Sequence, residues 1–171
     1  MNGNKEALLL IDIQDVYFMP GPLLLHKPSE AAGKAALVLD KFRKEDKPVI
    51  FIKHDFKVFS GINKIVKPWP GEKIIEKKYP SSFLETDLLE YLNEKKIGKL
   101  IVVGMMSHMC VDTTVRACQD HGIKVTVIED ACTTQSLKFK GEKIPATTVH
   151  KAFMASLDGM FAKVVSLEEY L

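Results

Sequence analysis

Three reactive side chains each come soon after the end of a predicted β-strand. Asp12 directly follows an apolar run near the N-terminus, Lys77 follows a short central run, and Cys110 lies in the turn beyond a third run. Carboxyl ends of parallel strands meet at one edge of a sheet, so we expect these side chains to lie together. A thiol nucleophile, a carboxylate that takes and returns its proton, and an ammonium that keeps the carboxylate ionised suit acyl transfer. Backbone N–H groups in the strand–helix turn can supply an oxyanion hole.

Cys110 is placed by the most distinctive stretch of the chain, residues 100–118. A β-branched apolar run precedes Gly104, and an apolar helical stripe follows Cys110. A cysteine in the first turn of a helix is near free amides and the positive end of the helix dipole, which favours the thiolate. The alternative is a small buried apolar residue, which describes most free cysteines. The cysteine alone leaves both interpretations open.

The elements that must position these residues alternate along the chain. Strands are predicted at 7–11, 49–52, 73–76, 100–103, 124–128 and 164–165. Helices are predicted from Glu30 to about Glu45 after a Ser29 cap, from Thr86 or Asp87 to near Gly98, from about Val111 to near Gly122, and from Pro145 to about Phe161. Ser166 and Glu169 form a capping box for a last turn. Loops are predicted at 14–28, 54–71 and 131–144.

This alternation predicts an α/β fold, with a mostly parallel sheet of about six strands covered by helices on both faces. Residues 1–171 are one domain by length, and 46% hydrophobic residues can fill one sizeable core. The net charge of +2 gives no case for nucleic acid or for a membrane surface. Three cysteines without a CxxC pair favour a reducing cytoplasm, and the N-terminal apolar run is too short for a signal peptide.

Three signatures, taken in order, resemble those of the isochorismatase-like cysteine hydrolases, a family that includes nicotinamidases, carbamoylsarcosine amidase and ureidoacrylate amidohydrolase. The first is DIQDVY from Asp12, resembling D-x-Q-x-x-F with tyrosine as its last residue. The second is KKYPSSF from Lys77, followed by Thr86-Asp87-Leu88. The third is GMMSHMCV from Gly104, followed by Thr114, Ala117, Gly122 and Glu129-Asp130-Ala131.

The resemblance implies a Rossmann-like three-layer sandwich and a catalytic triad of Cys110, Asp12 and Lys77. It also implies an oxyanion hole from the amides of Met106 and Cys110, a cis peptide between Met105 and Met106, and a homo-oligomer. Neighbouring side chains of an extended chain point to opposite sides, so Lys77 and Lys78 cannot both face the site. The family register selects Lys77.

Two departures from family patterns refine the expected chemistry. Metal-dependent nicotinamidases carry D-x-H after the second strand, whereas this chain reads Lys53-His54-Asp55-Phe56 and has no further histidine before His108. We therefore expect no bound metal and no cofactor. True isochorismatases lack the nucleophilic cysteine, so Cys110 points to hydrolysis of an amide or related C–N bond.

Other side chains are candidates for a substrate pocket. Tyr17, Phe18 and Trp69 are in loops near predicted strand ends and could stack on a planar amide, although loop aromatics more often only pack the loop. His108 is two residues before Cys110, and pocket lining is favoured over a Cys–His pair.

These observations predict a cysteine amidohydrolase that cleaves a small carboxamide or ureido substrate through a thioester. The alternatives are an ester-type hydrolase on the same fold and a binding protein that retains the fold without turnover. A redox thiol protein is a weaker alternative, because the chain lacks CxxC.

Overall fold

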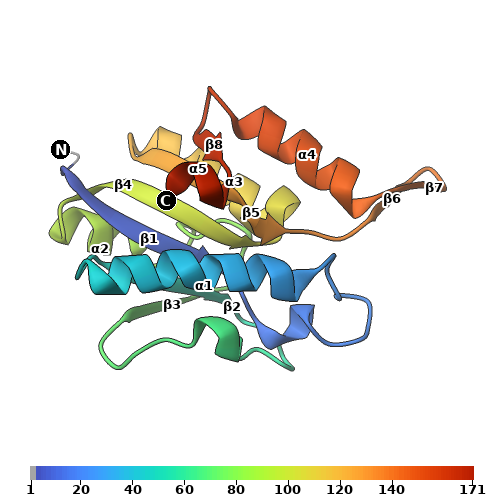
Figure 1. Ribbon diagram of the computed structural model, residues 1–171, viewed down its shortest axis with the longest axis horizontal. Coiled ribbons are helices and arrows are strands. Elements are labelled where there is room, and N and C mark those ends of the chain that lie inside the picture. The colour runs from blue at the N-terminus through green and yellow to red at the C-terminus, as the bar shows by residue number, and fades with distance from the viewer. Residues whose placement is uncertain (1–2) are drawn as a thin grey trace.

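The computed structural model describes residues 3–171 and has a parallel six-stranded sheet at its centre (Figure 1). The strand order is β3-β2-β1-β4-β5-β8. The strands are β1 (Lys5–Ile11), β2 (Val49–His54), β3 (Lys73–Lys77), β4 (Ile97–Met105), β5 (Lys124–Thr133) and β8 (Lys163–Val165). The chain builds outward from β1 to β3 and then returns to place β4 on the other side of β1. The order therefore reverses between β1 and β4, which is where open α/β sheets bind ligands.

Helices cover both faces of the sheet, as the alternating pattern predicts. The helices are α1 (Pro28–Lys44), α2 (Leu88–Glu94), α3 (Asp112–Asp120), α4 (Ala146–Leu157) and α5 (Leu167–Tyr170). Successive residues of β1 serve opposite faces: Leu8 and Leu10 pack in the cluster with α1 and α5, while Leu9 and Ile11 pack in the cluster with α2, α3 and α4. This division explains why residues 7–11 of β1 are all apolar.

Three local expectations differ from the structure. Ser29 does not cap α1, because Pro28 already occupies the first helical turn and suits it by its fixed φ. Gly98 does not stop α2, which ends at Glu94; Gly98 lies inside β4, where a Cβ would come within 1.9 Å of the Gly3 carbonyl oxygen. The polar segment 131–144 is not all loop.

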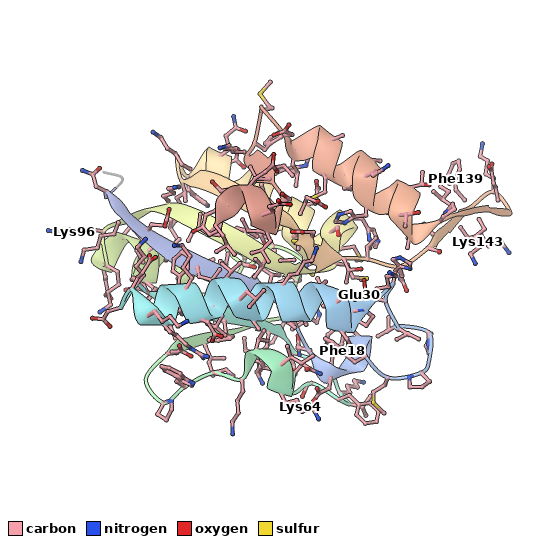
Figure 2. The ribbon with its side chains drawn as sticks, in the orientation of Figure 1. Phe18, Glu30, Lys64, Lys96, Phe139 and Lys143 are labelled. Carbon is pink, nitrogen blue, oxygen red and sulfur yellow. The ribbon has the colours of Figure 1, made fainter. Side chains whose placement is uncertain are left out.

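That polar segment contains the end of β5 and an antiparallel hairpin of β6 (Leu137–Phe139) and β7 (Glu142–Ile144). The hairpin extends from the body of the molecule, with Phe139 and Lys143 on it (Figure 2). Its polar composition lacks the apolar alternation by which a strand is detected in sequence, so the pattern missed it. The capping box of Ser166 and Glu169 is confirmed at the start of α5.

Candidate active site

The structure brings Asp12, Lys77 and Cys110 together at the carboxyl edge of the sheet. Nζ of Lys77 lies 2.7 Å from Oδ2 of Asp12 and donates a hydrogen bond of 3.2 Å to Sγ of Cys110. All three residues are buried, and the side chains of the ion pair are both 0% exposed. A buried charge pair is costly to desolvate, so its presence requires close mutual compensation.

Each side chain reaches the cluster from a different strand end. Asp12 directly follows β1 with φ of 50°, a left-handed conformation that aspartate tolerates better than most residues. Lys77 ends β3, two strands away from β1, and only a long side chain can span that gap. Lys78 is exposed, so Lys77 is the lysine that meets Asp12, as the register predicts.

Cys110 lies in a π-helical turn, Ser107–Val111, that joins β4 to α3. The Met106 carbonyl accepts from the amides of Met109 and Val111, at 3.0 and 3.3 Å, and closes this turn. The peptide between Met105 and Met106 is cis, as the family resemblance implies. Gly104 does not break β4. A Cβ there would lie 2.0 Å from the Ile11 carbonyl oxygen, so glycine allows β1 and β4 to approach closely beside the site.

Burial sets the protonation chemistry of the cluster. Burial raises the pKa of the Asp12 carboxyl, while the positive charge of Lys77 opposes that rise. Burial and the nearby charge of Asp12 raise the pKa of the Cys110 thiol to about 12, and Lys77 again opposes the rise. Burial thus opposes the effect expected of a helix N-terminus and favours the thiol over the thiolate. The thiol lies beside a carboxyl group whose proton affinity burial increases.

His54, the last residue of β2, is a further member of the cluster. Its Nδ1 lies 3.1 Å from Nζ of Lys77, its register partner on β3. In the sequence, His54 stands out only as part of a missing metal pattern, although it also lies at the end of a strand. Asp12, His54 and Cys110 offer ligand atoms that lie within 4.8 Å of one another. Because the ammonium of Lys77 already contacts all three, a divalent cation there would meet a positive charge.

The expected pocket residues occupy different places. Tyr17 is buried near the cluster, where the charges of Asp12 and Cys110 add to burial in raising its pKa. Phe18 packs against the α1 side of the core in the loop after β1 (Figure 2). Nδ1 of His108 lies 2.5 Å from Oγ1 of Thr134.

Trp69 is not brought to the triad. It lines a cleft with Val49 and Lys73, the first residues of β2 and β3, and these residues mark the opposite edge of the sheet. Its ring is covered by the guanidinium of Arg43 at 4.2 Å.

Several signature residues support the site without contacting a reactive atom. Oγ1 of Thr114 accepts from the Ser82 amide at 3.0 Å, which ties the loop after β3 to α3. Oγ1 of Thr86 donates to the Ser82 carbonyl at 2.6 Å. The sequence missed a second network, in which Oγ of Ser107 lies 2.7 Å from Nδ1 of His150 on α4. This contact links the catalytic turn to a helix far along the chain.

A cavity of about 290 Å³ lies between the first turns of α1 and α4 and the end of β5. Cys132 and His150 contribute to its wall, and Asp12, Lys77 and Cys110 do not. Across residues 3–171, no helix is both long enough and apolar enough to span a bilayer.

Comparisons with known proteins agree with this architecture. The isochorismatase domain model matches residues 6–169. The chain is 41% identical to an uncharacterised isochorismatase family protein, YddQ, of Bacillus subtilis, over 96% of this chain and 98% of YddQ. An isochorismatase crystal structure from Pseudomonas putida superposes with a TM-score of 0.93 at 36% identity, covering 99% of this chain and 93% of that one.

More distant relatives have named activities. Nicotinamidase 3 of Arabidopsis thaliana is 27% identical over 89% of this chain and 83% of its own length. Maleamate amidohydrolase of Pseudomonas putida is 22% identical over 98% of this chain and 85% of its own length. With the domain match across nearly the whole chain, the parallel sheet and the strand-end cluster, these relatives lead to one conclusion: the chain belongs to the isochorismatase family of hydrolases.

Proposed function

We propose that this protein is a cysteine amidohydrolase that cleaves the C–N bond of a small carboxamide or ureido substrate. The observation that carries the proposal is the buried contact of one ammonium, Lys77, with both a carboxylate and a thiol. The pair Asp12 and Cys110 can exchange a proton, and the charge of Lys77 favours the ionised form of either. The named relatives that hydrolyse amides, nicotinamidase 3 and maleamate amidohydrolase, support the same bond type.

The proposed reaction begins as Sγ of Cys110 attacks the carbonyl carbon and its proton passes to Asp12. The tetrahedral oxyanion collapses, the C–N bond breaks, and Asp12 returns the proton to the leaving nitrogen. A water molecule then gives its proton to Asp12 and attacks the thioester. The acid leaves, the C–S bond breaks, and the proton returns to Cys110.

The raised pKa values fit this sequence of proton transfers. Burial and the charge of Asp12 raise the pKa of the Cys110 thiol to about 12, which favours a thiol that gives up its proton as the C–S bond forms. Burial increases the proton affinity of Asp12, which makes it a better acceptor than an exposed aspartate.

Backbone amides and nearby aromatic rings complete the proposal. The amides of Met106 and Cys110 would stabilise the oxyanion, because the π-helical turn that follows Met106 carries the nucleophile. Tyr17, Phe18 and His108 are proposed to line the pocket. Trp69 lies at the opposite edge of the sheet, so we assign it no substrate contact.

The test is turnover of a panel of small amides by wild type, Cys110→Ala and Cys110→Ser, followed by release of ammonia or amine. We expect turnover by wild type and none above background by Cys110→Ala. Quenched wild-type reactions should show an added acyl mass on Cys110. Near wild-type turnover by Cys110→Ala would refute covalent catalysis, while turnover of esters but not amides would favour the ester-type alternative. Binding of amides by wild type without turnover would favour the alternative of a binding protein on the same fold.

We also propose that the enzyme needs no metal or other cofactor, since Lys77 supplies the positive charge at the point where Asp12, His54 and Cys110 converge. Activity should survive dialysis against EDTA. Loss of activity that zinc restores would contradict this.

We also propose a reducing, cytoplasmic location and a homo-oligomer. The three cysteines are all free and buried, which suits a reducing compartment.

A further inference from the structure

The ammonium of Lys77 has three close neighbours: Asp12 is its ion-pair partner, and His54 and Cys110 lie within hydrogen-bond distance. These are Oδ2 of Asp12 at 2.7 Å, Nδ1 of His54 at 3.1 Å and Sγ of Cys110 at 3.2 Å. A lysine ammonium has three donors and no acceptor, so His54 can be its hydrogen-bond partner only by accepting. For His54 this requires a bare Nδ1 and a proton on Nε2.

His54 is held through its backbone by Gln14, and its ring contacts Phe56. Gln14 is fully buried and clamps the His54 backbone: its Oε1 accepts from the His54 amide at 2.7 Å, and its Nε2 donates to the His54 carbonyl at 2.9 Å. Nε2 of Gln14 also donates to the Ser60 carbonyl at 2.7 Å. The ring of Phe56 lies 4.8 Å from the His54 ring, centroid to centroid. The fixed backbone and the ring contact place Nδ1 beside Lys77.

We propose that His54 is a positioning residue for the hydrolysis, whose neutral Nδ1 accepts one N–H of Lys77 and so fixes the ammonium between Asp12 and Cys110. This inference rests on the proposed function, because it gives Lys77 its orientation in that reaction. Without the acceptor, the ammonium can rotate and one N–H loses its partner in a buried site. His54 touches no reacting atom in this role and acts through Lys77.

The charges around the ring favour its neutral form. The charged groups that face it are Lys77 from β3, Asp12 after β1 and Asp55 next to it in the chain. Burial and the positive charge of Lys77 lower the pKa of His54 below its ordinary 6.5, against the pull of the two aspartates. Protonation of the ring would remove the acceptor and place a second positive charge beside the ammonium.

Two substitutions of His54 distinguish the effect of the acceptor atom from that of the bulk of the ring. Asparagine carries an oxygen on Cγ, where histidine carries Nδ1, whereas leucine fills a similar space without an acceptor. We expect His54→Leu to lower kcat roughly tenfold or more with KM little changed, the size of one lost hydrogen bond to a charged group. His54→Asn should recover most of that loss. His26→Leu, at an exposed histidine, is the matched control and should keep wild-type kcat.

A second measurement needs no substrate. In long-range ¹H–¹⁵N NMR spectra of wild type, the His54 ring should carry its proton on Nε2 and titrate below the ordinary histidine range. In Lys77→Met the ring should titrate at a higher pH, because the nearby positive charge is gone. An Nδ1–H tautomer in wild type, or a titration unchanged by Lys77→Met, would overturn the proposed contact.

The two measurements keep this inference separate from the proposed function. If no amide is turned over by wild type, the hydrolase proposal fails while the NMR result still decides the His54 contact. Full activity of His54→Leu, or a His54→Asn variant as slow as His54→Leu while both remain folded by thermal melting, would overturn the positioning role.

Discussion

The two ends of β3 carry the same kind of ion pair in opposite surroundings. At the start of the strand, Lys73 pairs with Asp87, and their side chains are 26% and 51% exposed. At the end of the strand, Lys77 pairs with Asp12, and both side chains are 0% exposed. The residue types are the same, but the second pair is buried and its lysine also contacts His54 and Cys110.

We propose that this difference separates a surface ion pair from a catalytic one. An exposed pair is screened by water and contributes about 0–1 kcal/mol to stability. A buried pair loses hydration that its mutual attraction only partly restores, so stability alone gives a weak reason to keep it. Burial next to Cys110 instead gives Asp12 a raised pKa beside a thiol, the combination that proton transfer needs. If burial makes this distinction, substitutions at the two ends of β3 should have different effects on activity.

The largest expected effect is that of Asp12→Asn. An amide cannot accept the thiol proton, so we expect kcat to fall by about 10²–10⁴-fold, the usual contribution of a general base. The assay is amide turnover under saturating substrate, with circular dichroism to show that the fold is kept. High residual activity would mean that another group takes the proton, and His108 would then be the candidate.

Next in size is Lys77→Met compared with Lys78→Met. Removal of the buried ammonium should raise the activation free energy by about 2–4 kcal/mol, by analogy with loss of an oxyanion-hole donor. Lys78 is exposed, and its replacement should change kcat little. Parallel assays of both variants decide the matter. An inactive Lys78→Met beside an active Lys77→Met would contradict the contact between Lys77 and Asp12.

A smaller effect is expected in the pH dependence. Asp12 must be ionised to accept the proton, and burial raises its pKa above the ordinary 3.8, so kcat/KM should fall on the acid side above that value. Loss of the Lys77 charge should move this acid limb to higher pH. Lys78→Met should leave the limb in place. The kcat/KM profile can be measured from about pH 4 to about pH 9 for wild type and for the residual activity of Lys77→Met. An acid limb that does not move in Lys77→Met would show that the ionisation of Asp12 does not set the limb.

The smallest effect belongs to the other end of β3. Lys73→Met should change the free energy of unfolding by no more than about 1 kcal/mol, because the lost pair with Asp87 is exposed. It should leave kcat at the wild-type value. Urea unfolding measures the first quantity and the amide assay the second. A large loss of kcat in Lys73→Met would remove the contrast between the two ends of the strand.

Patterns with strong local signals were predicted correctly. The continuous apolar runs became β1, β2 and β4, because strands buried on both faces need apolar residues at every position. The capping box at Ser166 is a local motif and needs no distant partner. Gly98 and the β6–β7 hairpin were misjudged since a close backbone approach and a polar strand leave no periodic signal in sequence.

By itself, the sequence determined the order of strands and helices and which reactive residues follow strand ends. These properties depend on local patterns, so Asp12, Lys77 and Cys110 could be selected before their contacts were known. Only the tertiary structure decided that burial and the charge of Asp12 raise the pKa of the Cys110 thiol and that His54 joins the cluster. Both depend on burial and on charges from separate strands, since desolvation and Coulomb attraction are set by distance in space, which sequence spacing does not give.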